Sequence, residues 1–288
     1  MFSRVLVAFD GSPQGTAALA LAAVLSARDG EVLICSVQHP RSARSRVDPA
    51  APRLDPLAAK RCVERAKELL PAQTISHPLI LEALDVAGAL RDAACFHDVE
   101  LIVLGSSHRG RLGQTMLGSV AMEMLHDPPC PVAVATVGKQ EGVMPTHIGT
   151  VAVGCEVADK LGPELVIAVQ LAGDLRATLH VVGVADTRVA MAVEYGGAVA
   201  YPAVLKARRL ASEEGLAAVM AGLPPSVSAT GEVREGSPVE KLVEVSRGVD
   251  LLVLGAHHYG PVDRLMGRSI SAAVRRRVCC PLLVVPLG

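Results

Sequence analysis

One stretch of the chain, from Val99 to Ser119, has the residue types and spacing of a phosphate-binding turn. Its apolar run at 101–104 is typical of a strand that is buried on both faces. The run breaks at Gly105 into a loop rich in Gly and Ser, and a helical pattern begins at Gly118 and Ser119. Backbone N–H groups and the positive end of a helix dipole converge in such a turn. The stretch therefore predicts a site for a phosphate-bearing ligand.

The same stretch occurs a second time, and the two copies keep one register. The matching pairs are Gly105 with Gly255, His108 with His258, Gly110 with Gly260 and Ser119 with Ser269, and the members of each pair lie 150 residues apart. A constant offset over so many residues indicates an internal duplication. We therefore expect two domains, at 1–138 and 148–288, joined by a linker at 139–147.

Strand-like apolar runs alternate with helical patterns in both halves. Strands are predicted at 5–9, 32–37, 75–81, 101–104 and 131–136, and again at 151–155, 178–184, 227–233, 251–254 and 281–285. Helices are predicted at 17–27 (closed by Asp29-Gly30), 57–70, 87–96 and 120–126, and near 162–171, 204–221, 239–245 and just before Arg277. This alternation predicts an α/β fold with one doubly wound, five-stranded parallel sheet in each half. Ligands of such sheets bind beyond the carboxyl ends of the strands, where Asp10 and Gly105 stand.

Composition excludes several classes of function. The net charge of −1 argues against a general nucleic-acid binder. No apolar run is long enough to predict a membrane span, and the N-terminus lacks the cleavage pattern of a signal peptide. The seven cysteines are odd in number and include no Cys-x-x-Cys, which favours reduced thiols. We therefore expect a cytoplasmic protein with neither a membrane nor a nucleic acid as partner.

Motifs of catalysis are missing from the sequence. There is no Walker A pattern with its lysine, no Gly-x-Gly-x-x-Gly fingerprint and no nucleophile elbow. The adjacent His257 and His258 would point to opposite faces of an extended chain, so they do not predict a metal site. We expect no catalytic residue, and hydrolysis of a bound nucleotide would be slow at most.

Four segments of the first half carry a resemblance to a known family. They are Val-Ala-Phe-Asp-Gly-Ser at 7–12, Leu-Ile-Val-Leu-Gly at 101–105, Leu-Gly-Ser-Val at 117–120 and Cys-Pro-Val-Ala-Val at 130–134. Each half resembles a universal stress protein domain, and the chain resembles a tandem universal stress protein. The resemblance implies that the two sheets pair through their last strands as an intramolecular pseudo-dimer.

The resemblance also implies a site for ATP, with ADP or AMP as alternatives and Mg²⁺ as a companion. Asp10 would meet the ribose or the adenine, and Ala8 and Val37 would line the adenine. The residues implied around the ribose and phosphates are Leu104, Gly105, Arg109, Gly110, Gly118, Ser119 and Val120. The family's middle glycine is replaced by His108, which would either fill the space or donate a hydrogen bond to phosphate, unless Gly110 takes over that role.

The second half departs further from the family pattern. Glu156 stands in the place of Asp10, Gly255 is kept, and His258 again replaces the middle glycine. Arg268 replaces the glycine before Ser269, where a large side chain would either cap the phosphate site with positive charge or occlude it. Occlusion makes this a degenerate second site and predicts that nucleotide binds chiefly in the first half.

Two functions from different classes follow. The first is a stress-response protein that binds an adenine nucleotide and acts by regulation or by binding an unknown protein partner. A second copy of the chain, in a further homodimer, is one such partner. The alternative is a nucleotide-free interaction scaffold whose glycine loops are only tight turns.

Overall fold

The computed structural model describes residues 1–38, 56–106, 118–126, 128–136, 147–155, 162–187, 201–256 and 277–286. The chain divides into two compact units, Met1–His147 and Ile148–Gly288. Within the described residues, no helix has the length and apolar character that crossing a membrane requires. The predicted linker falls outside the described residues except for His147.

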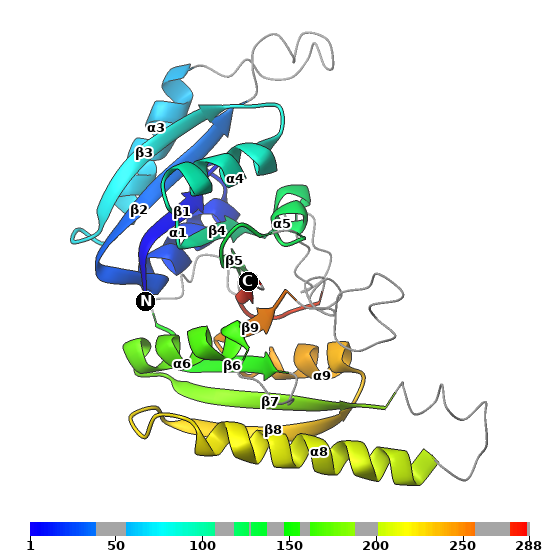
Figure 1. The fold of residues 1–288 in the computed structure, drawn as a ribbon. Coiled ribbons are helices and arrows are strands. Elements are labelled where there is room, and N and C mark those ends of the chain that lie inside the picture. Colours follow the sequence, from blue (N-terminus) through cyan, green and yellow to red (C-terminus); the bar gives the residue numbers. More distant parts are fainter. Residues whose placement is uncertain are drawn as a thin grey trace. The chain divides into compact units, whose positions relative to one another are not determined.

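The first unit is a parallel sheet covered by helices (Figure 1). Its strands are β1 (Phe2–Ala8), β2 (Ser26–Gln38), β3 (Ile75–Glu82), β4 (Leu101–Gly105) and β5 (Val132–Ala135), and its helices are α1 (Pro13–Leu25), α3 (Pro56–Leu69), α4 (Val86–Phe96) and α5 (Ser119–Met124). The strand order is β3-β2-β1-β4-β5, and the pairings are parallel. Because parallel crossovers are right-handed, α1 and α3 share one face and α4 returns across the other.

The second unit repeats this topology. It contains β6 (Thr150–Cys155), α6 (Pro163–Leu175), β7 (Thr178–Asp186), α8 (Tyr201–Ala221), β8 (Ala229–Gly236), α9 (Pro238–Val245), β9 (Leu251–Gly255) and β10 (Leu282–Val285). The order β10-β9-β6-β7-β8 places β6 where β1 lies in the first unit. The predicted doubly wound α/β fold is thus confirmed. The helix predicted before Arg277 lies outside the described residues, and the pseudo-dimer stays a prediction.

The central strands form the core of each unit. Val5, Leu6 and Val7 of β1 are fully buried, as are Val151, Ala152 and Val153 of β6. A strand in the middle of a parallel sheet has helices on both of its faces, so every side chain is buried and the apolar run does not alternate. This is why the short runs in the sequence located the strands well.

The predicted boundary between the first helix and the second strand is wrong. Helix α1 ends at Leu25, and β2 begins at Ser26, where the prediction had a helix continuing to 27 and closing at Asp29-Gly30. The register explains the difference, because Phe2 pairs with Ser26 but Arg4 pairs with Glu31. The extra residues of β2 form an irregularity in the strand. Gly30 suits it, since a Cβ there would lie 2.8 Å from Ser26 Oγ.

Replacing Gly173 in α6 with alanine is expected to stabilise the protein. The new Cβ would meet only Val227 Cγ2, at 3.8 Å, which is ordinary contact. Alanine is favoured over glycine in a helix by about 0.5–1 kcal/mol, so the free energy of unfolding should rise by about that amount in denaturant titration. Gly231→Ala is the control, because its Cβ would crowd Met220 Sδ at 3.0 Å. A loss of stability in Gly173→Ala would contradict the prediction.

Candidate functional site

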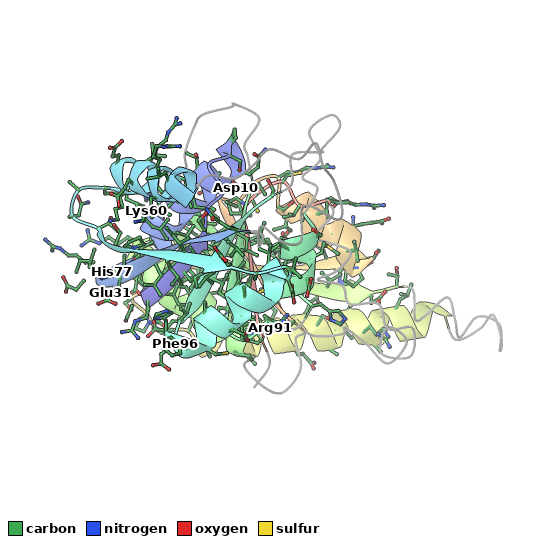
Figure 2. All side chains as sticks on the ribbon, turned by 90° about the horizontal axis from the view of Figure 1, so that it is seen from above. Asp10, Glu31, Lys60, His77, Arg91 and Phe96 are labelled. Atoms are coloured by element: carbon green, nitrogen blue, oxygen red, sulfur yellow. The ribbon has the colours of Figure 1, made fainter. Side chains whose placement is uncertain are left out.

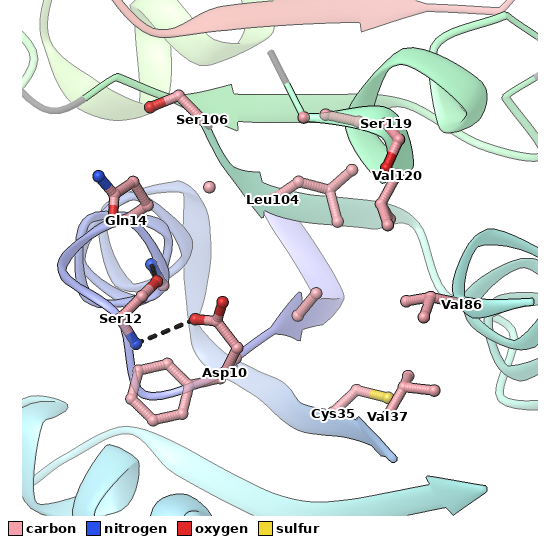
Figure 3. Close-up of a pocket in the computed structure, with 16 residues that line it drawn as sticks. Asp10, Ser12, Gln14, Cys35, Val37, Val86, Leu104, Ser106, Ser119 and Val120 are labelled. Carbon is pink, nitrogen blue, oxygen red and sulfur yellow. Dashed lines mark hydrogen bonds between the residues drawn. The ribbon is translucent and has the colours of Figure 1, made fainter. Parts of the chain in front are cut away.

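The carboxyl ends of β1 and β4 open onto a cavity in the first unit (Figure 3). Its volume is about 280 Å³, close to the lower end of the range for small-molecule sites, roughly 300–1,000 Å³. The chain leaves β1 toward β2 on one side, and β4 lies on the other side, so the cavity stands at the switch point of the strand order. Ligands of doubly wound sheets bind at this place.

The structure brings together around this cavity all the predicted first-half residues that it describes. They are Ala8, Asp10, Val37, Leu104, Gly105, Gly118, Ser119 and Val120. His108, Arg109 and Gly110 lie outside the described residues, and so does the rest of the loop that follows Ser106.

The turn between β1 and α1 presents the carboxylate of Asp10. Asp10 is exposed, and its Oδ1 accepts a hydrogen bond from the backbone N–H of Ser12 at 3.0 Å. Ser12 is the N-cap of α1, and its Oγ accepts from Gly15 N at 3.0 Å. Gly11 has a φ of +81°, a left-handed conformation that glycine adopts without strain. The turn therefore holds one carboxylate oxygen against the chain and leaves the other toward the cavity.

Gly15 and Gly105 let α1 approach the strand ends closely. A Cβ on Gly15 would lie 2.9 Å from Asp10 Oδ1. A Cβ on Gly105 would lie only 2.6 Å from the backbone oxygen of Gln14. Gly105 was predicted to lie beside ribose and phosphate, but the contact with Gln14 gives this glycine a packing role as well.

One side of the cavity is apolar. Ala8 and Val37 come from β1 and β2, Leu104 comes from β4, and Val120 comes from α5. Cys35 of β2 also lines it, and burial raises the pKa of the Cys35 thiol to about 12, so the thiol is neutral at physiological pH. A flat apolar ring can lie against these side chains while polar groups of the same ligand reach Asp10.

Several lining residues were missed by sequence reasoning. Ser12 and Gln14 come from the start of α1, Val86 comes from the first turn of α4, and Ser106 follows β4. Gln14 Oε1 is buried and has no hydrogen-bond partner among the described residues. Ser12 followed by Pro13 is a pattern typical of a helix start, and it could have signalled that the first turn of α1 adjoins Asp10. No sequence signal marks Val86, whose position depends on how α4 crosses the sheet.

Helix α5 begins at Ser119, with Gly118 as its N-cap residue. No side-chain hydrogen bond caps this end, and Ser119 and Val120 both face the cavity. The structure therefore has a strand directly before the predicted loop and a helix start directly after it. Among the described lining residues, Asp10 is the only carboxylate.

The second unit differs at the matching position. Val151 pairs with Leu251 as Val5 pairs with Leu101, so Gly154 takes the place of Ala8. A Cβ on Gly154 would lie 2.7 Å from Leu242 Cδ2 and 2.8 Å from Leu254 Cδ2. Leu242 of α9 and Leu254 of β9 thus take up the room that the Ala8 methyl group has in the first unit. Gly255 is buried at the end of β9, whereas Glu156, His258, Arg268 and Ser269 lie outside the described residues.

Comparison with known proteins identifies relatives of both units. A sequence profile of the Universal stress protein family matches residues 1–136 and 151–286. Universal stress proteins of Mycobacterium tuberculosis and Mycobacterium bovis are 30% identical over 189 residues, which are 65% of this chain and 62% of each relative. The match therefore spans less than two thirds of these relatives. A universal stress protein of Thermus aquaticus is 30% identical over 138 residues, 46% of this chain and 97% of that protein.

Solved structures share the fold at low identity. A universal stress protein from Archaeoglobus fulgidus has a TM-score of 0.65 at 18% identity and covers 99% of this chain and 96% of its own. A functionally unknown protein from Pseudomonas aeruginosa has a TM-score of 0.66 at 16% identity, with 99% and 93% covered. At such identities the likeness concerns the fold alone.

Proposed function

The chain belongs to the universal stress protein family, and on this premise we propose that its first half binds an adenine nucleotide in the cavity between β1 and β4. The ligand we assign is ATP with Mg²⁺, with ADP and AMP as alternatives. The observation that carries the proposal is the exposed carboxylate of Asp10 beside an apolar cavity at the switch point of the sheet.

The lining suits the parts of such a nucleotide. Adenine is flat and largely apolar on its faces, and it would lie against Ala8, Val37 and Leu104. A carboxylate only accepts hydrogen bonds, so Asp10 would take them from ribose hydroxyls or from an amino group of the base. The phosphates would extend toward Gly118 and the start of α5, where backbone N–H groups can donate to an anion.

The proposal assigns the nucleotide to the first half. In the second half Leu242 and Leu254 lie against Gly154 and take up the room of a Cβ at the position of Ala8. Arg268 stands in the sequence where the first half has Gly118. Both features reduce the room for a ligand, so the second half would support the first without binding nucleotide itself.

We propose that the nucleotide acts by regulation, in a cytoplasmic stress response, through affinity for a partner. A nucleotide shifts a population of conformers only by binding one of them more tightly. The rival function, a nucleotide-free scaffold, is favoured by one observation. The contact between Gly105 and the Gln14 backbone explains that glycine without any ligand.

The test is to denature protein freshly purified from its expression host and identify the released nucleotide by chromatography and mass spectrometry. We expect about one adenine nucleotide per chain. Emptied protein should gain about 2.7 kcal/mol of stability from ATP–Mg²⁺ at roughly 100 times its dissociation constant, measured by thermal unfolding. GTP–Mg²⁺ is the control ligand. Two nucleotides per chain would contradict the assignment to one half, and an empty protein that ATP does not stabilise would favour the scaffold.

A further inference from the structure

An open groove runs along the first unit between the edge strand β3 and helix α4. Its volume is about 820 Å³. Small residues form its floor on the helix side, and larger apolar side chains stand along it. The small residues are Gly88, Ala89 and Ala93, and the larger ones are Leu79, Leu81, Leu84 and Phe96. The groove is separate from the nucleotide cavity, which α4 meets through Val86.

Two large apolar side chains at this groove are exposed to solvent. The exposed fraction is 83% for Phe96 and 66% for Leu84. Both values are higher than that of any other large apolar side chain among the described residues. Figure 2 shows Phe96 at the periphery of the first unit, at the end of α4. Phenylalanine is enriched in protein interfaces, and exposed apolar side chains that gather in a groove indicate a binding surface.

Three acidic side chains and one histidine, His97, line the groove. Glu82, Asp85 and Asp92 line it and are exposed, whereas no Lys or Arg does. Asp85 caps α4 by accepting a hydrogen bond from Gly88 N at 3.0 Å. Within the described part of the chain, neither Glu82 nor Asp92 has an ion-pair partner. A cationic partner is therefore attracted to this surface, and an anionic one is repelled.

The dimensions favour a helix as the occupant. Helix α4 has 11 residues and extends about 16 Å along the groove, about three helical turns. The Asp85 carboxylate covers Gly88, but Ala89 has only a methyl side chain, so a second helix can approach this turn of α4 closely. We propose that this groove binds an amphipathic helix of a partner protein, with apolar side chains on the buried face and Lys or Arg on the flanks.

A synthetic helix tests the proposal on the full chain. The probe is a fluorescein-labelled amphipathic peptide of Leu and Lys in helical spacing, and its charge control has Glu in place of Lys. Fluorescence anisotropy should show saturable binding of the Leu/Lys peptide and none of the Leu/Glu peptide. Hydrogen exchange measured with the Leu/Lys peptide bound should slow in β3 and α4 and not elsewhere.

Variants locate the binding. The double variant Glu82→Lys with Asp92→Lys should lower the affinity for the Leu/Lys peptide by about tenfold or more. Phe96→Ser should lower this affinity by a similar factor. Matched controls are Glu68→Lys on α3 and Val166→Ser on α6, both exposed, which should leave the affinity unchanged. All these side chains lie at the surface, so circular dichroism should show folded proteins. ATP–Mg²⁺ affinity should be the same in all of them, which separates this test from that of the nucleotide site.

Two results would overturn the proposal. The first is that the Leu/Lys peptide binds the groove variants as tightly as the parent, or that the control variants lose affinity to the same degree. The attraction would then not be specific to the groove. The other is a chain that sediments as a dimer and that Phe96→Ser converts to a monomer. In that case the occupant of the groove is a second copy of this chain.

Discussion

Asp10→Ala is expected to lower the affinity of the chain for ATP–Mg²⁺ by about ten- to a hundredfold. A hydrogen bond to a charged group contributes about 1.5–3 kcal/mol, and tenfold in affinity corresponds to about 1.4 kcal/mol. Asp10 is the only carboxylate among the described residues that line the cavity, so no neighbour there can replace it. Isothermal titration calorimetry on nucleotide-free protein measures the effect.

Two further variants separate loss of the ligand contact from damage to the turn. Asp10→Asn keeps an oxygen that can accept from Ser12 N, so its stability should stay near that of the parent while its affinity falls, because the charge is lost. Glu156→Ala removes the matching carboxylate of the second half and should leave the affinity unchanged. The assignment of the nucleotide to the first half fails if Asp10→Ala binds ATP as tightly as the parent, or if Glu156→Ala weakens binding equally.

The fold was largely predictable because the buried strands of a parallel sheet have short, continuous apolar sequences. Runs such as 101–104 and 251–254 are buried on both faces and end at glycines. The start of β2 was not predictable. Its first residues, Ser26 to Gly30, are polar or small, and they extend as a strand only because Phe2 pairs with Ser26 across an irregular register. That pairing is a tertiary interaction, which local sequence does not contain.

The residues of the candidate site were predictable where they lie at the end of a strand. They were less predictable where the packing of a helix places them at the cavity. Ala8, Asp10 and Leu104 stand at or beside the ends of β1 and β4, so the topology alone gathers them. Val86 depends on how α4 crosses the sheet. In the second half, Leu242 lies against Gly154 for the same reason, and only the structure shows it.

Gly105→Ala is expected to destabilise the first unit by about 1–3 kcal/mol without any nucleotide present. Its Cβ would lie 2.6 Å from the oxygen of Gln14 and 2.7 Å from the carbonyl carbon. Both atoms are backbone, so the clash is relieved only if the start of α1 moves away from β4, and overpacking of this kind costs about that much. Denaturant unfolding followed by far-ultraviolet circular dichroism measures the change.

The aromatic residues offer an internal control for this variant. The three tyrosines, Tyr195, Tyr201 and Tyr259, all belong to the second half. Tyrosine fluorescence therefore reports on the second half, while hydrogen exchange in the first turn of α1 should accelerate. An unchanged free energy of unfolding, together with lost affinity for ATP, would mean that Gly105 serves the ligand rather than the packing. The expected loss of stability would show that Gly105 serves the packing of α1 against β4. This packing comes first, because the cavity beside Asp10 forms only when α1 lies close to β4.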